Sequence, residues 1–130
     1  MKPLQKIMLI DDNQADNVYH KLIIEEAGVA SNVISFEYAE DALAHLSHGD
    51  VSDVQLIFLD INMPRMNGFE FLSAYADLTK EQQADVVVMM LTTSLNPKDE
   101  VRALAYNEVI GFRNKPLTVG MLNEIIEEHF

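Results

Sequence analysis

Five short apolar runs alternate along the chain with segments in which apolar residues recur at helical spacing. Apolar runs closed by turn residues are typical of strands buried on both faces, and the amphipathic segments are typical of helices that cover those faces. Strands that alternate with helices pair in parallel through right-handed crossovers. The alternation therefore predicts a doubly wound α/β domain with a five-stranded parallel sheet and helices on both faces.

The predicted elements follow directly from these two patterns. We place the strands at residues 7–10, 32–36, 56–59, 86–91 and 109–112. We place the helices at residues 15–27, 39–46, 69–76, 97–105 and 118–129. A chain of 130 residues is close to the modal size of one domain, so we expect a single domain over residues 1–130.

The first and fourth predicted helices have clear end signals. Gly28 follows the last turn of the first helix as a C-cap, and Asn96 and Pro97 stand at the start of the fourth as N-cap and first residue. The apolar residues at helical spacing in the first helix are Val18, Tyr19, Leu22, Ile23 and Ile24. The fourth helix has only a modest apolar face, formed by Val101, Leu104 and Ala105.

Composition excludes several classes of function. The formal net charge is −12 with only nine Lys and Arg residues, so direct binding to nucleic acid is not expected. The absence of cysteine excludes disulfides, thiolate nucleophiles and sulfur-bound metals. No apolar run approaches the roughly 20 residues that cross a bilayer, and the first residues lack the apolar core of a signal peptide. We therefore expect a cytoplasmic protein with no membrane partner.

Polar residues follow four of the predicted strands at or just beyond the point where each strand ends. They are Asp11 and Asp12 after the first strand, Asp60 after the third, Thr92 and Thr93 after the fourth, and Lys115 beyond the fifth. Each residue alone is explained equally well as a helix cap or a turn residue. The carboxyl ends of parallel strands lie at one edge of a sheet, where open α/β sheets bind their ligands. Together these residues predict one site.

The predicted site has the chemistry of phosphoryl transfer. Carboxylates within a few Å of one another raise each other's pKa values unless a cation intervenes, and ligation by oxygen alone favours Mg²⁺. Lys115 and a threonine hydroxyl would complete a site for a phosphoryl group. A carboxylate can also be the nucleophile and form an aspartyl phosphate. Asp60 is the candidate because it stands between the acidic pair and the lysine and threonine residues.

These motifs together resemble the receiver domain of two-component response regulators. The resemblance rests on Asp11-Asp12, Asp60-Ile61-Asn62-Met63-Pro64 with Asn67-Gly68, a threonine after the fourth strand, and Lys115-Pro116. It extends over about residues 6–129 and implies a stand-alone receiver similar to chemotaxis regulators. The implied fold is flavodoxin-like, with the strand order 2-1-3-4-5 carried over from that family.

The resemblance implies a role for each site residue. Asp60 would accept a phosphoryl group from a phosphohistidine on a sensor histidine kinase or a histidine phosphotransfer protein. Asp12, Asp60 and the backbone carbonyl of Asn62 would bind Mg²⁺, and Asp11 would act through water. Lys115 would pair with the phosphoryl oxygens, and the Lys115-Pro116 peptide bond would be cis. The protein would not be an enzyme in the usual sense, since it would catalyse only its own phosphorylation and dephosphorylation.

The resemblance also implies a switch. In the family, a Thr or Ser moves toward the phosphoryl group while an aromatic residue on the fifth strand turns inward. Thr92 and Phe112 match these positions, and Thr93 is the alternative hydroxyl because the segment before Lys115 could hide a one-residue shift. Asn62 and Thr93 would control access to the phosphoryl group. The fourth helix, fifth strand and fifth helix would form the surface that binds an unknown downstream protein.

Two other functions explain part of the pattern. One is a receiver-like binding module that is never phosphorylated, which a failure to bind Mg²⁺ would favour. The other is a phosphatase of the haloacid dehalogenase type, which also uses an aspartate nucleophile and Mg²⁺. That class has a second acid two positions after the nucleophile, where this chain has Asn62, and a cap domain for which 130 residues leave no room.

Overall fold

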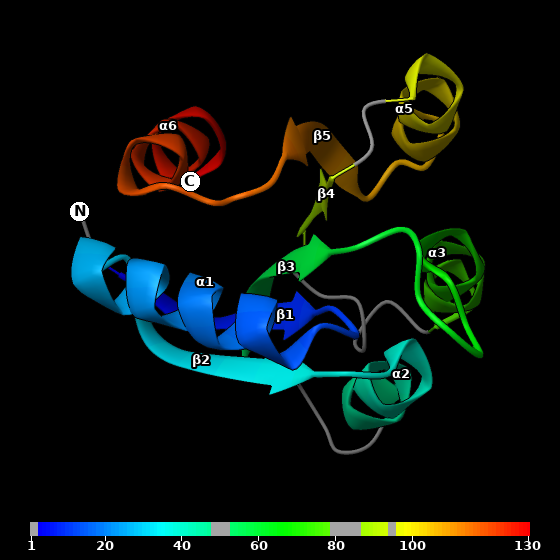
Figure 1. The fold of residues 1–130 in the computed structure, drawn as a ribbon, viewed down its shortest axis with the longest axis horizontal. Coiled ribbons are helices and arrows are strands. Elements are labelled where there is room, and N and C mark those ends of the chain that lie inside the picture. Colours follow the sequence, from blue (N-terminus) through cyan, green and yellow to red (C-terminus); the bar gives the residue numbers. More distant parts are fainter. Residues whose placement is uncertain (1–2, 48–52, 79–86, 94–95) are drawn as a thin grey trace.

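The computed structural model describes residues 3–47, 53–78, 87–93 and 96–130. The strands are β1 (Leu4–Ile10), β2 (Ala30–Phe36), β3 (Val54–Leu59), β4 (Val87–Thr92) and β5 (Val109–Asn114). The helices are α1 (Gln14–Ala27), α2 (Ala39–Ser47), α3 (Gly68–Ala76), α5 (Pro97–Leu104) and α6 (Val119–His129). The predicted alternation of strands and helices is confirmed (Figure 1). Val86, which we included in the fourth strand, lies outside the described residues.

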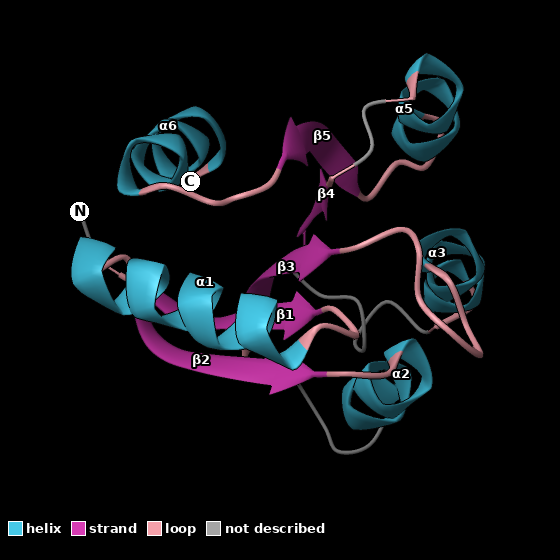
Figure 2. Ribbon diagram, viewed as in Figure 1, coloured by secondary structure: helices cyan, strands magenta, loops and turns pink. Residues whose placement is uncertain are grey.

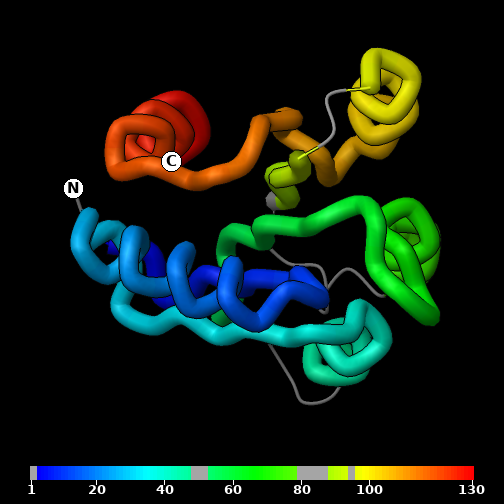
Figure 3. The backbone as a smooth tube through the Cα atoms, in the orientation of Figure 1, coloured from blue at the N-terminus to red at the C-terminus, as the bar shows by residue number. Residues whose placement is uncertain are grey.

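The strands form one parallel sheet in the order β2-β1-β3-β4-β5. The arrowheads of β1, β2 and β3 point the same way in Figure 2. The chain path in Figure 3 leaves β1, passes through α1 and continues into β2. The doubly wound fold and the strand order are therefore as expected. Parallel pairing brings the carboxyl ends of the strands to one edge of the sheet, where the predicted site residues lie.

Helices cover both faces of the sheet. The helices α1 and α6 lie on one face, and α2, α3 and α5 lie on the other (Figure 1). Successive strand residues point to opposite faces, so Leu56 and Phe58 of β3 pack in the core under α1 and α6. Ile57 and Leu59 pack in the core under α2 and α3. Burial on both faces explains why β3 reads as an unbroken apolar run from Leu56 to Leu59.

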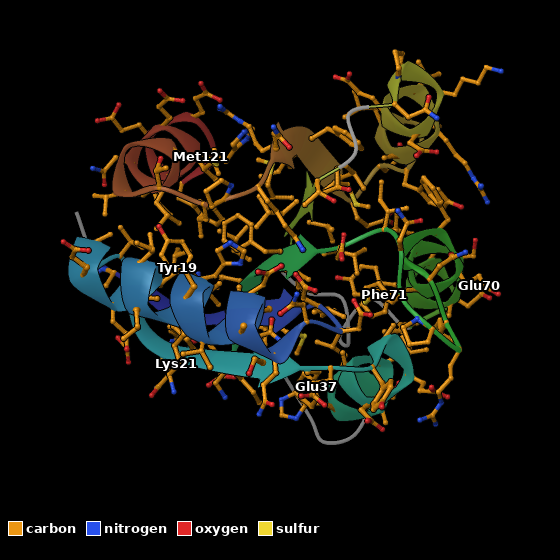
Figure 4. The ribbon with its side chains drawn as sticks, viewed as in Figure 1. Tyr19, Lys21, Glu37, Glu70, Phe71 and Met121 are labelled. Carbon is orange, nitrogen blue, oxygen red and sulfur yellow. The ribbon has the colours of Figure 1, made fainter. Side chains whose placement is uncertain are left out.

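The helix α3 packs its apolar side on the sheet and fixes its start with a capping box. Phe71 is fully buried and points toward the sheet, whereas the neighbouring Glu70 is exposed and points away (Figure 4). The Asn67 side chain accepts a hydrogen bond from the Glu70 amide at 2.8 Å, and the Glu70 side chain accepts one from the Asn67 amide at 3.0 Å. These two bonds satisfy amides that a helix start leaves unpaired.

The helix α1 buries only some of the apolar residues that the sequence pattern selects, namely Ile24 and, in part, Ile23. Its exposed residues include Val18, Tyr19 and Leu22, and its buried ones are Asn17, His20 and Ile24. The reason is that the inner side of α1 faces the polar end of β1. There the Asn17 side-chain amide donates a hydrogen bond of 2.8 Å to the Asp11 main-chain oxygen. A buried amide with a partner is tolerated where an aliphatic side chain would leave that oxygen unpaired.

The helix α5 also differs from its predicted packing. Val101 is 73% exposed and Leu104 is 48% exposed, and Ala105 is exposed as well. The residue of α5 that is buried is Ala103. In addition, the Arg102 guanidinium lies 4.0 Å from the centre of the Phe69 ring, a cation–π contact. The helix therefore rests on a small side chain and a stacked arginine, and its larger apolar side chains face outward.

Gly68 begins α3 against the backbone that follows β3. A Cβ atom at this position would lie 2.5 Å from the Asp60 carbonyl oxygen and 3.0 Å from the Ile61 Cα. Because both neighbours are backbone atoms, no side-chain rotation relieves the clash. We expect Gly68→Ala to lower the free energy of unfolding by about 1–3 kcal/mol, measured by urea denaturation.

Gly120 provides the control for this substitution. A Cβ atom at Gly120, in the first turn of α6, would meet nothing within 4 Å. Gly120→Ala is expected to leave stability unchanged or to raise it by about 0.5–1 kcal/mol, since alanine favours a helix over glycine. Equal stabilities of Gly68→Ala and Gly120→Ala would contradict the predicted clash.

Candidate functional site

The ends of four strands meet at the carboxyl edge of the sheet. The Asp60 amide donates a hydrogen bond of 3.0 Å to the Ile10 oxygen, which ties the end of β3 to the end of β1. The Lys115 amide donates one of 2.8 Å to the Thr92 oxygen, which ties the end of β5 to the end of β4. The backbone therefore holds the phosphoacceptor candidate and the lysine candidate on a common edge.

The Lys115 ammonium lies among three carboxylates. Its Nζ is 2.5 Å from Asp11 Oδ2, 3.1 Å from Asp16 Oδ2 and 3.4 Å from Asp60 Oδ2. The lysine side chain is only 9% exposed. An ammonium has three hydrogen-bond donors, so these three oxygens can satisfy all of them. The Lys115-Pro116 peptide bond is cis, as the family resemblance implied.

The candidate metal ligands are also close together. Carboxylate oxygens of Asp11, Asp12 and Asp60 lie within 4.8 Å of one another. Asp11 and Asp60 are buried and Asp12 is exposed, so the cluster is open to water on one side. An all-oxygen donor set that leaves room for water is what Mg²⁺ requires. The residues present therefore fit Mg²⁺.

Burial and neighbouring charges change the pKa values of the site. Burial raises the pKa of Asp60, the charge of Lys115 opposes this increase and the charge of Asp11 adds to it, with the result that the pKa is about 6. The Ile61 amide donates a hydrogen bond of 2.8 Å to Asp60 Oδ1 and moderates the increase. For Lys115, burial favours the neutral amine, but the hydrogen bond to Asp11 and the charge of Asp60 outweigh it and raise the pKa. The lysine therefore stays charged.

The raised pKa of Asp60 predicts a stability that depends on pH. The pKa is about 6 in the folded protein and 3.8 in an unperturbed carboxyl group, so ionisation of Asp60 destabilises the fold. The cost grows as the pH rises through about 3.8 and is complete above about pH 6–7. Asp60→Asn lacks this cost. In Mg²⁺-free buffer, we expect the free energy of unfolding of Asp60→Asn relative to the wild type to be about 2 kcal/mol higher at pH 7.5 than at pH 4. Urea unfolding at both pH values measures this, and an equal difference at both would contradict it.

The switch candidates lie at the end of β4 and within β5. Thr92 is buried as the last residue of β4, whereas Thr93 is exposed. Phe112 is partly buried against the core under α2 and α3. Asn62 is exposed in the loop between β3 and α3. Their positions near the carboxyl edge agree with the prediction, and their roles in switching and access stay predictions.

Asp16 is a site residue that the sequence did not reveal. It lies in the first turn of α1, where acidic residues are common because they interact favourably with the helix N-terminus. That ordinary explanation hid its contact with Lys115. His20, one turn further along α1, is buried near the same groups, and burial lowers the pKa of this histidine. At neutral pH it therefore adds no positive charge to the site.

Arg65 is a second residue missed at the sequence level. It lies in the loop after β3 with a φ of 71°, which is uncommon for a residue other than glycine. Its Nε forms an ion pair of 2.6 Å with Glu40 of α2, and its guanidinium lies 4.7 Å from the centre of the Tyr38 ring. These contacts fasten the loop that carries Asn62 to the start of α2.

Sequence comparison identifies relatives of this chain among signalling proteins. Hybrid signal transduction histidine kinase C of Dictyostelium discoideum is 30% identical over 120 residues, covering 85% of this chain but only 9% of that protein. The chain thus spans less than a tenth of the length of that curated relative. A chemotaxis protein CheY homolog of Campylobacter jejuni is 26% identical and covers 95% of this chain and 90% of its own length.

Solved structures show the same fold. A two component response regulator from Cytophaga hutchinsonii matches with a TM-score of 0.87 and 27% identity, covering 98% of this chain and 97% of its own. A response regulator receiver protein from Dyadobacter fermentans matches with a TM-score of 0.86 and 28% identity, covering 97% of this chain and 98% of its own. Among the described residues, no helix is long and apolar enough to cross a membrane. The family model for the response regulator receiver domain matches residues 7–127, and the chain therefore belongs to this family of two-component signalling domains.

Proposed function

We propose that this receiver takes a phosphoryl group onto Asp60 in an Mg²⁺-dependent reaction. The observation that carries the proposal is the position of the Lys115 ammonium, 3.4 Å from Asp60 Oδ2 and beside the carboxylates of the candidate metal site. One positive charge and one acidic cluster thus flank a single carboxylate at the edge of the sheet. This is the arrangement that phosphoryl transfer requires, since the transferred group carries negative charge on its outer oxygens.

Each neighbour of Asp60 has a proposed role. Asp12, Asp60 and the backbone carbonyl of Asn62 would hold Mg²⁺, with Asp11 acting through water. The ion, when bound, would neutralise charge shared by the carboxylates and the phosphoryl oxygens. Lys115 would bind a phosphoryl oxygen while it keeps the edge of the sheet in place. The raised pKa of Asp60 supports a need for cations, because a nucleophilic carboxylate must be ionised.

The proposed reaction is a direct transfer. An Asp60 carboxylate oxygen forms a bond to phosphorus while the bond between phosphorus and the donor's imidazole nitrogen breaks, and the electron pair of that bond stays on the imidazole. The donor would be a sensor histidine kinase or a histidine phosphotransfer protein, acting on one receiver domain over residues 1–130 in the cytoplasm. The chain would catalyse only this step and its own dephosphorylation.

The output would be a change of surface. Thr92 would move toward the phosphoryl group and Phe112 would turn inward, with Thr93 as the alternative hydroxyl. Asn62 and Thr93 would control access of water to the phosphoryl group. A two-state surface shifts only when its ligand interacts differently with the two states, and here the difference would come from the phosphoryl charge. The surface formed by α5, β5 and α6 would then bind a downstream protein rather than nucleic acid.

Intact mass spectrometry after treatment with a small acyl phosphate tests the proposal. We expect the mass of one phosphoryl group to be added in Mg²⁺ and none to be added when the metal is chelated. A chain that stays unlabelled and binds no Mg²⁺ would instead be a receiver-like module that is never phosphorylated. Multiple turnover of a phosphomonoester would identify a phosphatase of the haloacid dehalogenase type.

A further inference from the structure

Asp16 adds a fourth carboxylate to the site, and none of the proposed metal or phosphoryl roles uses it. Its Oδ2 is 3.1 Å from Lys115 Nζ, on the side of the ammonium that faces α1. The Asp16 side chain is 37% exposed, whereas that of Lys115 is 9% exposed. Asp16 is therefore a partly exposed carboxylate that forms an ion pair with a nearly buried ammonium.

Lys115 and Mg²⁺ would use the same oxygen atoms. Besides Asp16, the ammonium contacts Asp11 at 2.5 Å and Asp60 at 3.4 Å, and both acids belong to the candidate metal cluster. Two cations on the same carboxylates repel each other, so Mg²⁺ binding has to weaken these lysine contacts. A nearly buried ammonium that loses its acceptors is strongly disfavoured. Lys115 therefore requires a hydrogen-bond acceptor that is not also a ligand of the metal.

We propose that Asp16 is this acceptor and that, as a positioning residue, it strengthens Mg²⁺ binding by holding Lys115. The inference rests on the proposed function, since it concerns the metal of that reaction. Asp16 binds the ammonium whether or not the other two carboxylates are occupied.

The start of α1 holds Asp16 in a fixed position relative to the site. The Asn13 side chain accepts a hydrogen bond of 3.1 Å from the Asp16 amide, and the Asn13 amide donates one of 3.0 Å to Asp11 Oδ1. The Asn17 side chain donates one of 2.8 Å to the Asp11 main-chain oxygen. Asn13, which precedes Asp16, and Asn17, which follows it, are therefore both hydrogen-bonded to Asp11. Asp16 can therefore hold the lysine without a movement of α1.

Magnesium titration of the unphosphorylated protein, followed by ¹H–¹⁵N NMR at constant ionic strength, tests the proposal. We expect Asp16→Asn to raise the Kd for Mg²⁺ about three- to tenfold, because Lys115 then shifts onto Asp11 and Asp60 and competes with the ion. Asp16→Glu keeps the charge and is expected to bind within about twofold of the wild type. Urea unfolding and the NMR spectra show that each variant is folded.

A charge-matched control and a double-mutant cycle separate this mechanism from simple loss of charge. Glu26 is exposed near the far end of α1, about 15 Å along the helix from Asp16, so Glu26→Gln is expected to leave the Kd unchanged. In a Lys115→Ala background, the effect of Asp16→Asn is expected to fall to less than half of its size in the wild type.

The outcomes distinguish this inference from the proposed function. If Asp16→Asn binds Mg²⁺ as Glu26→Gln does, or if its effect is the same with and without Lys115, the positioning role is overturned while the phosphoacceptor assignment stands. If the wild type binds no Mg²⁺, the metal-dependent function and this inference are both overturned.

Discussion

The variant Asp60→Asn is expected to take up no phosphoryl group from a small acyl phosphate in Mg²⁺, whereas the wild type takes up one per chain. Asparagine has nearly the same shape, and its side-chain oxygen can still accept the hydrogen bond of 2.8 Å that the Ile61 amide donates to Asp60 Oδ1. The fold should therefore be preserved. What the substitution removes is the nucleophile, since a neutral amide does not attack phosphorus as a carboxylate does. Intact mass spectrometry measures the outcome.

Asp41→Asn is the matched control for this prediction. Asp41 is an exposed residue in the first turn of α2, outside the acidic cluster. Its replacement by asparagine makes the same change of charge and shape as Asp60→Asn. The control is expected to be labelled like the wild type. Labelling of Asp60→Asn to the same stoichiometry as Asp41→Asn would rule out Asp60 as the phosphoacceptor.

The fold could be predicted because burial on two faces leaves a simple record in the sequence. In β3, the residues from Leu56 to Leu59 pack alternately into the two cores, so the strand has no polar side and reads as an apolar run. The order of the strands has no such record. Periodicity indicates strands and helices but does not say which strands are neighbours, and the order came from the family resemblance.

The acids and the lysine could be predicted because parallel topology brings strand ends together. Asp11, Asp60 and Lys115 lie far apart in the sequence and within one cluster of contacts in the structure. Asp16 and Arg65 could not be predicted in this way. The contact of Asp16 depends on how α1 is rotated about its axis, and that of Arg65 depends on the path of a loop.

The rotation of α1 also explains why only part of its predicted apolar face, Ile23 and Ile24, is turned toward the core. A pattern of apolar residues predicts the buried side of a helix when the surface beneath it is apolar. Here the helix starts beside the polar end of β1, so Asn17 and His20 are buried and Val18 and Leu22 are exposed. The polar groups at the end of β1, such as the Asp11 main-chain oxygen that Asn17 binds, favour polar residues on the inward side of the start of α1.

Lys115→Ala is expected to slow labelling of Asp60 by at least about 100-fold, because it removes the positive charge that would stabilise the transferring phosphoryl oxygens. Lys98→Ala, at an exposed position in α5, removes the same charge outside the site and is expected to be labelled at the wild-type rate. Time-resolved intact mass spectrometry measures both rates. A rate for Lys115→Ala within a few-fold of that for Lys98→Ala would show that the lysine has no part in the transfer.

The same variant is expected to bind Mg²⁺ more tightly than the wild type while it reacts more slowly. Lys115 contacts Asp11 and Asp60, so its removal frees both carboxylates from a competing cation. The charge of Lys115 also lowers the pKa of Asp60, so the variant should have a higher carboxyl pKa in the absence of metal. NMR titrations with Mg²⁺ and with acid measure the two effects. Tighter metal binding combined with slower labelling would assign the lysine to the phosphoryl group, whereas weaker metal binding would show that it mainly holds the acidic residues in place.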